Sequence, residues 1–287
     1  MNVTYKVRIV VPEIWSQEIK VEGNKVERLL FTEKESEVTI IPTETKGVLK
    51  ATVVDDANHG DYLIIKNNKC DTSQYPDLPI LKVRKTSDFD SISKDTKLSW
   101  LKSPSEFTPK LSPSEVAKSW VNKFSFREEN EKLLIRGLRT PQVGALHAIS
   151  AEFSKSNVEP CTVVLPTGTG KTETMLSTTI YHRCSKVLVL VPSNSLRDQI
   201  GEKFKTLGCL KELGVIDQDT LYPAVTKIKQ GIKSVDDANQ ILDSSNVIIA
   251  TPQILNSKFS KPDVLTTLCE GCDYLFVDEA HHISAKK

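Results

Sequence analysis

One short segment, Leu165–Thr172, constrains the fold of this chain more than any other. It reads Leu-Pro-Thr-Gly-Thr-Gly-Lys-Thr. The preceding run Cys161–Leu165 has the length and β-branching of a buried strand, and Lys171–Arg183 can continue as a helix. In a strand, glycine loop and helix, free backbone N–H groups and the positive end of the helix dipole together favour a polyphosphate. The sequence therefore predicts a phosphate-binding loop of the Walker A type.

Each residue type in this loop has a chemical reason. Gly168 and Gly170 let the backbone approach the phosphates, Lys171 supplies a charge for the β- and γ-phosphates, and the Thr172 hydroxyl can hold Mg²⁺. The general pattern has glycine at the position of Leu165, so this chain departs from it there. The alternative is an ordinary glycine turn between a strand and a helix.

A second motif lies downstream, where the apolar run Asp273–Val277 is followed by Asp278-Glu279-Ala280-His281. Adjacent acids usually belong to a solvated turn, but these directly follow a strand of the buried type. The first carboxylate can orient Mg²⁺ and the second can polarise an attacking water. This is the Walker B pattern.

Together, Thr167–Thr172 and Asp278–His281 resemble motifs I and II of the DEAD/DEAH-box helicases of superfamily 2, a resemblance that includes type III restriction subunits and phage-defence helicases. In that family alanine is common at the position of Leu165. Three further stretches resemble family motifs in the same order: Arg139–Gln142 (Q motif), Val187–Leu196 (motif Ia) and Ile248–Gln253. The resemblance covers roughly residues 130–287.

The resemblance implies ATP and Mg²⁺ as cofactors, and it assigns roles residue by residue. ATP would be held by Gln142, which reads the adenine edge, and by Thr167, Gly168, Thr169, Gly170, Lys171 and Thr172. Thr172 and Asp278 would hold Mg²⁺, and catalysis would rest on Lys171, Asp278, Glu279 and His281, the last coupling the site to nucleic acid. Pro192, Ser193, Asn194, Thr251 and Pro252 would hold the backbone of a strand, although Ser193 and Thr251 can equally serve as helix caps.

The function predicted in this way is that of an ATP-dependent nucleic-acid helicase or translocase that acts on single- or double-stranded nucleic acid, with DNA slightly favoured. The alternative is a nucleotide-binding switch or clamp that unwinds nothing. In the family, motif III and a second RecA-like domain with its arginine fingers follow motif II. We therefore expect the chain to be part of a longer protein. By itself it should bind Mg-ATP but hydrolyse it slowly.

Hydrophobic periodicity divides the 287 residues into two predicted domains. A β-rich domain over 1–102 has short strands at Val3–Val11, Glu37–Ile41, Val48–Val54, Tyr62–Ile65 and Leu78–Val83, and it is a candidate adapter for a protein partner. A Pro/Ser-rich linker over 103–113 follows. Residues 114–287 alternate strands and helices, which predicts a RecA-like α/β domain with helices on both faces of a parallel sheet.

Several local expectations accompany this division. Ser112-Pro113-Ser114-Glu115 combines a capping box with a first-turn proline, so a helix should carry Val116, Trp120 and Phe124 into the core. Arg127–Arg136 should form a charged, solvated helix. His147 should be semi-buried on the helix that begins at Gln142. Asn58–Asp61 is a hairpin signal.

Composition limits the remaining possibilities. The irregular spacing of six cysteines suits reduced thiols and a cytoplasmic protein, and no apolar run is long enough to cross a membrane. Cys269 and Cys272 form a CxxC, but no second ligand pair is near in sequence, so we do not expect zinc. The net charge of +1 means that any affinity for nucleic acid must come from a local surface.

Overall fold

The computed structural model of the chain describes residues 4–16, 19–53, 60–155, 159–166, 168–256 and 260–280. The chain divides into two compact units: residues 1–17 with 29–110, and residues 18–28 with 111–287. The division after residue 110 falls inside the predicted linker. Residues 18–28 differ from the prediction, because their strands pair within the second unit rather than the first.

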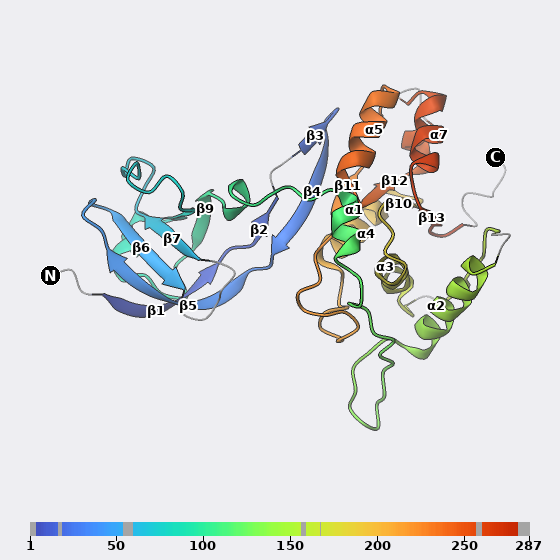
Figure 1. Cartoon of the computed structure of the whole chain (residues 1–287), viewed down its shortest axis with the longest axis horizontal. Coiled ribbons are helices and arrows are strands. Elements are labelled where there is room, and N and C mark those ends of the chain that lie inside the picture. The colour runs from blue at the N-terminus through green and yellow to red at the C-terminus, as the bar shows by residue number, and fades with distance from the viewer. Residues whose placement is uncertain are drawn as a thin grey trace. The chain divides into compact units, whose positions relative to one another are not determined.

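The first unit is built from β-strands that form a sheet in the order β1-β5-β6-β7-β8-β9 (Figure 1). Neighbours are antiparallel except β7 and β8. The elements are β1 (Tyr5–Val11), β2 (Ile14–Trp15), β5 (Lys34–Pro42), β6 (Val48–Val53), β7 (Asp61–Ile65), β8 (Ile80–Val83), η1 (Thr86–Ser91), β9 (Leu98–Lys102) and η2 (Pro104–Glu106). Alternate residues such as Ile9, Val38 and Leu81 enter one core. The predicted strands correspond to β1, β5, β6, β7 and β8.

The second unit is a mixed α/β structure, consistent with a RecA-like domain. Its strands lie in the order β13-β10-β12-β11-β4, with β3 on the far side of β4; β10 to β13 are mutually parallel and β4 is antiparallel to β11. The elements are β3 (Ile19–Val21), β4 (Asn24–Phe31), α1 (Pro113–Lys118), α2 (Thr140–Phe153), α3 (Lys171–Tyr181), β10 (Val187–Leu190), α4 (Asn194–Thr206), β11 (Ala224–Lys227), α5 (Val235–Ser244), β12 (Val247–Ala250), α6 (Pro252–Leu255), α7 (Pro262–Glu270) and β13 (Tyr274–Val277). The last residues of β4, from Leu29, pair with β2 in the first unit.

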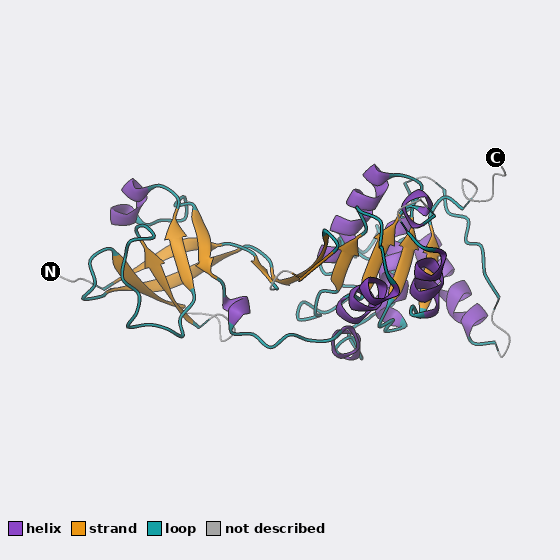
Figure 2. Cartoon of the chain, turned by 90° about the horizontal axis from the view of Figure 1, so that it is seen from above, coloured by secondary structure: helices purple, strands orange, loops and turns teal. Residues whose placement is uncertain are grey.

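Helices cover both faces of this sheet (Figure 2). Leu188 and Ile248 point towards α5 and α7, where they join a core with Ile241 and Leu268. The opposite face packs against α4, which contacts β11 and β12. Central parallel strands that are apolar on both faces, such as β12, need such double cover. The predicted layering is therefore present.

The predicted strand Cys161–Leu165 is not formed, which corrects the expectation. These residues have no regular structure, and the Val164 side chain is 86% exposed. A strand needs a hydrogen-bonded neighbour, and among the described residues the outer edge of β13 has none. Without a hydrogen-bonded neighbour, β-branching alone does not create a strand.

The predicted helix Arg127–Arg136 is also wrong. The segment doubles back as a hairpin-like loop, in which the backbones of Asn130 and Ile135 exchange hydrogen bonds of 2.9 Å. Close approach of the two sides is possible because residue 137 is glycine: a Cβ there would lie 2.5 Å from the Arg127 carbonyl oxygen. The pattern of charges indicated an exposed segment but could not reveal this contact between the two sides of the loop.

The predicted helix after Ser112 begins as expected, with the Ser112–Glu115 capping box, but it ends at Lys118. Trp120 lies beyond it and is nevertheless fully buried, where its indole N–H donates to the Leu221 carbonyl at 2.9 Å. Its core role is confirmed. His147 is exposed rather than semi-buried, and its ring stacks on Phe126.

Asn58 and His59 of the predicted hairpin lie outside the described residues. Within the described residues, no three or more His, Cys, Asp or Glu side chains gather as metal ligands, and no helix is long and apolar enough to span a membrane. Cys269 and Cys272 are free thiols.

Candidate functional site

The phosphate loop leads directly into α3. Gly170 precedes the helix with φ of 89°, and Gly168 has φ of 80°, values that favour glycine at both positions. A Cβ on Gly168 would meet nothing within 4 Å, so space is open beside the loop, whereas a Cβ on Gly170 would lie 2.0 Å from the Gln142 side-chain nitrogen. The N-cap residue of α3 is Gly170, which has no side chain to cap the helix. The first N–H groups of a helix are donors of the kind that an anionic ligand accepts from.

The structure brings the two sequence motifs together. Lys171 Nζ lies 2.7 Å from Glu279 Oε1, and both side chains are about one-third exposed. Glu279 reaches this position because β13 pairs in parallel with β10 and the Asp278 N–H continues the ladder to the Leu190 carbonyl at 2.9 Å. The hydrogen bond with Glu279 raises the pKa of Lys171, which stays a cation.

Asp278 is half-buried beside this ion pair. Burial raises the pKa of its carboxyl group, and the neighbouring Glu279 charge raises it further. Thr172 lies in the first turn of α3, next to Lys171. A hydroxyl and a carboxylate are oxygen ligands of the kind that Mg²⁺ accepts, so the donor set at this edge fits the ion.

The Q-motif residues contact the phosphate loop itself. Gln142 is only 5% exposed; its Oε1 accepts from the Arg139 N–H at 2.8 Å, and its Nε2 donates to the Gly170 carbonyl at 3.1 Å. Arg139 Nη1 donates to the Gly168 carbonyl at 2.6 Å. Gln142 thus links the start of α2 to the phosphate loop through two hydrogen bonds. Its role in reading adenine remains a prediction. Sequence reasoning had given Arg139 no role of its own.

Thr167 and His281 lie outside the described residues. Their assignment to ATP binding and to coupling with nucleic acid therefore stays a prediction.

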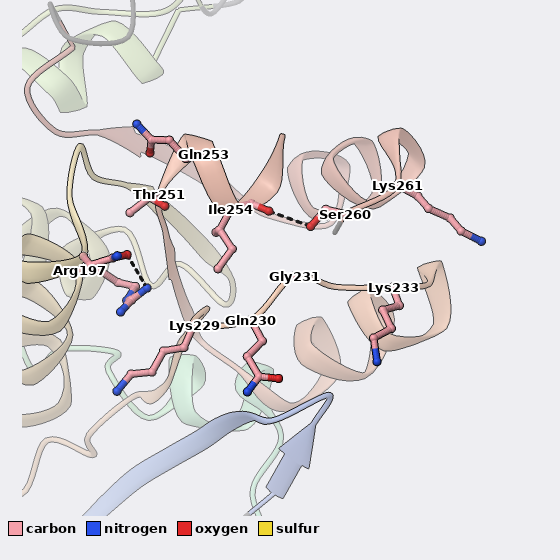
Figure 3. A pocket seen from close by; sticks show the side chains of 11 residues that line it. Arg197, Lys229, Gln230, Gly231, Lys233, Thr251, Gln253, Ile254, Ser260 and Lys261 are labelled. Carbon is pink, nitrogen blue, oxygen red and sulfur yellow. Dashed lines mark hydrogen bonds between the residues drawn. The ribbon is translucent and has the colours of Figure 1, made fainter. Parts of the chain in front are cut away.

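A second candidate site lies at the carboxyl ends of β10, β11 and β12. Here a pocket of about 880 Å³ opens between the loop after β11 and the start of α6 (Figure 3). It is lined by Asn194, Arg197, Lys229, Gln230, Gly231, Lys233, Thr251, Gln253, Ile254, Ser260 and Lys261. Of the predicted nucleic-acid contacts, Asn194 and Thr251 line the pocket. Ser193 caps α4 by accepting from the Leu196 N–H at 3.3 Å, and Pro252 opens α6.

The pocket is strongly basic. In the described part of the chain its lining includes Arg197, Lys229, Lys233 and Lys261 but no carboxylate. Arg197 is buried and forms the floor, where its Nη1 donates to Asn194 Oδ1 at 2.9 Å and to the Ile228 carbonyl at 3.0 Å. The lysines are more accessible to a ligand. Such a local surface is what an almost neutral chain needs in order to bind a polyanion.

Sequence reasoning missed these cations. Arg197 lies on a helix with charged residues and would be expected to face solvent, but its side chain turns inward to bond Asn194 and the Ile228 carbonyl. Lys229 and Lys233 follow β11, a short strand that no motif marked. The spacing of lysines at 227, 229 and 233 was the available signal.

Together, the α/β sheet, the glycine loop and the paired acids define a domain of the ATP-dependent helicase type. The chain belongs to the family described as type III restriction enzyme, res subunit, whose model matches residues 135–287. It is also similar to reverse gyrase 2 of Sulfolobus acidocaldarius, with 34% identity over 101 residues, which is 31% of this chain and 9% of that protein. The chain thus spans a small part of that relative. No solved structure matches it. The resemblance to superfamily 2 helicases is confirmed at the level of the family.

Proposed function

We propose that this chain is the ATP-binding portion of a nucleic-acid helicase or translocase, and that it couples nucleotide binding to a grip on the nucleic-acid backbone. One observation carries the proposal: both candidate sites lie at the carboxyl edge of the same sheet, where its parallel strands end. Glu279 follows β13, Asn194 follows β10 and Thr251 follows β12. In open α/β sheets ligands bind at this edge.

At the nucleotide site, Gly168 to Thr172 would hold the phosphates of ATP, and Thr172 with Asp278 would hold Mg²⁺. Bound ATP supplies the phosphoanhydride whose hydrolysis drives the motor. Lys171 would leave Glu279 to neutralise the phosphates, and the Glu279 carboxylate could then orient water. Nucleotide binding would thus break the Lys171–Glu279 ion pair and replace it with a contact between Lys171 and the phosphates.

At the nucleic-acid site, the basic pocket would take the phosphates of one strand, with the N-termini of α4 and α6 beside it. Base edges are not needed for such a grip, so affinity should depend on salt rather than on sequence. The same proposal has finer parts. They are a preference for DNA over RNA, binding of a protein partner by the β-rich unit, and cooperation with a second RecA-like domain. They also include a place in restriction or phage defence and a cytoplasmic location.

The test is reciprocal linkage between the two ligands. If the sites are coupled, Mg-ATP must change the affinity for a labelled single-stranded oligonucleotide, and the oligonucleotide must change the affinity for ATP by the same factor. The Lys171→Ala variant should lose the effect of ATP while still binding the oligonucleotide. The double variant Lys229→Gln, Lys261→Gln should bind the oligonucleotide more weakly. Its affinity for ATP, measured without oligonucleotide, should be unchanged.

Phosphate release, measured with and without the oligonucleotide, distinguishes the two candidate functions. Stimulated release supports a motor. Linked binding without hydrolysis, in the chain and in a longer protein that contains it, would identify a nucleotide-dependent clamp instead. Independent binding of the two ligands would refute the proposed coupling.

A further inference from the structure

The hairpin of β3 and β4 brings a distant part of the sequence to the basic pocket. β4 runs antiparallel to β11, and Val26 pairs with Thr226. The turn at 22–23 therefore lies beyond the carboxyl end of β11, next to the loop 229–231 (Figure 3). This turn and the pocket both belong to the second unit.

Asn24 holds the pocket loop through its side-chain amide. It is 1% exposed; Oδ1 accepts from the N–H groups of Lys229 at 2.8 Å and Gln230 at 3.0 Å, and Nδ2 donates to the Gln230 carbonyl at 3.1 Å. One side chain thus satisfies three backbone groups just past the end of a strand. Gly23 adds a close approach, since a Cβ there would lie 2.6 Å from the Gln230 side-chain oxygen.

Glu22 reaches the rim of the same pocket. Its backbone has φ of 48°, a conformation that suits Gly, Asn or Asp better than Glu. Its carboxylate lies 2.5 Å from Lys233 Nζ, and with this contact in place the Lys233 side chain is 72% exposed. The hydrogen bond with Glu22 raises the pKa of Lys233. A carboxylate and a phosphate offer an ammonium group the same kind of charged acceptor.

We propose that the turn Glu22–Asn24 is part of the nucleic-acid site: Asn24 is a positioning residue that sets the loop 229–231, and the Glu22 carboxylate occupies Lys233 until a backbone phosphate displaces it. The inference rests on the proposed binding of nucleic acid in the basic pocket. In this proposal the Glu22 carboxylate competes with the phosphates for Lys233, which lowers the affinity for nucleic acid. A segment from the N-terminal part of the chain thereby becomes part of the nucleic-acid site.

The first arm of the test removes the competitor. A labelled single-stranded oligonucleotide is titrated with the full chain at several salt concentrations, with fluorescence anisotropy as the readout. Glu22→Gln keeps the side-chain length and removes the charge, so affinity should rise about 2- to 5-fold at low salt, the size of one exposed ion pair. In a Lys233→Gln background the same substitution should have no effect, because its target is gone.

Asp243→Asn is the matched control. Asp243 is an exposed carboxylate paired with Lys186 at 3.3 Å, and both residues lie towards the amino ends of β10 and β12, away from the pocket. Its substitution changes the net charge by the same amount. If it raises affinity as much as Glu22→Gln does, the effect is one of overall charge and the competitor role is overturned.

The second arm concerns Asn24. Asn24→Ala should weaken the oligonucleotide and lower the slope of log affinity against log salt by about 0.7 for each phosphate that the pocket no longer binds, while ATP binding without oligonucleotide stays unchanged. If Asn24 has only a structural role, the substitution should lower the melting temperature. The slope of log affinity against log salt, measured on the folded protein, should then stay the same. That result overturns the positioning role, and the Glu22 arm stands whether or not Asn24→Ala folds. Failure of the wild-type chain to bind overturns the proposed function as well.

Discussion

Gln142→Ala separates two roles for one buried side chain. The resemblance to helicases implies that Gln142 reads adenine, so its loss should weaken ATP and spare GTP. In the structure both groups of its amide are already engaged, with the Arg139 N–H and the Gly170 carbonyl. We therefore expect the substitution to loosen the start of α2 and the phosphate loop together, and to weaken ATP and GTP alike.

The structure sets the size of the effect. Two hydrogen bonds are removed, each worth about 0.5–1.5 kcal/mol net, so the free energy of unfolding of the second unit should fall by about 1–3 kcal/mol. For a unit of this size that corresponds to a fall in melting temperature of about 2–12 °C. If the same hydrogen bonds shape the loop for phosphates, ATP and GTP should both weaken by up to about 100-fold.

The assay combines thermal unfolding with titration of fluorescent ATP and GTP analogues. Gln199→Ala is the control, because Gln199 is an exposed glutamine on α4. It should change neither quantity. Suppose instead that the melting temperature is unchanged and only the affinity for ATP falls. That result would refute the role of Gln142 in holding the phosphate loop and would support its role in reading adenine.

Three further predictions concern the nucleotide site. Lys171→Ala should weaken ATP about 10- to 150-fold, as for the loss of a charged hydrogen bond, with little change in stability because its partner is partly exposed; equal dissociation constants for the two forms would count against the loop. Glu279→Gln removes the carboxylate that holds Lys171, so ATP should bind as tightly or tighter while single-turnover phosphate release falls; wild-type release would contradict its role. Burial raises the pKa of Asp278, so the Mg²⁺-dependent part of ATP binding should decline on acidification at a higher pH than for an ordinary aspartate; Asp278→Asn should abolish that dependence, and a persisting one would exclude Asp278.

Local chemistry in the sequence was sufficient to predict the motifs and most strands. A loop with glycines at 168 and 170 must follow the backbone that those glycines allow, and Ser112 with Glu115 caps a helix wherever the chain lies. These predictions need only neighbours in sequence. Lys171 and Glu279 meet in the structure although only Glu279 follows a strand, because the strand expected before the phosphate loop is not formed.

Three of the failures share a physical cause, because each depended on a partner far away in the sequence. Residues 161–165 have the β-branching of a strand but no described neighbour to pair with. The hairpin at 19–28 carries charged residues that mask its strands, and it is stabilised by β11 about 200 positions later. The basic pocket gathers Arg197 from α4, Lys229 from the loop after β11 and Lys261 from the start of α7. Periodicity cannot report such pairings.

The attachment of this hairpin to the second unit makes a further prediction through Lys205. This lysine is 4% exposed and forms ion pairs with Glu27 on β4 and with Glu202, the latter at 3.1 Å. Lys205→Met leaves carboxylates that water can reach, and Glu202 keeps Lys227 at 2.5 Å. Glu27→Gln with Glu202→Gln instead keeps the buried ammonium and removes the charges of these two carboxylates. We expect the double variant to lose about 3–5 kcal/mol of unfolding free energy and Lys205→Met clearly less.

The pH dependence of stability tests the cause. Burial lowers the pKa of Lys205, but hydrogen bonds and charge from Glu27 and Glu202 outweigh it, so the pKa lies above its ordinary 10.5. The contribution of Lys205 in the wild-type chain is therefore complete below that value and is lost as pH rises through the raised pKa. In the double variant the contributions of Glu27 and Glu202 that raise the pKa of Lys205 are lost, while burial still lowers it. Its stability deficit should then shrink as pH rises towards 10, because the ammonium can shed its proton. Denaturant unfolding at several pH values measures both slopes. A deficit that does not change with pH would show that poorer packing, and not the loss of the two carboxylate charges, weakens the hairpin.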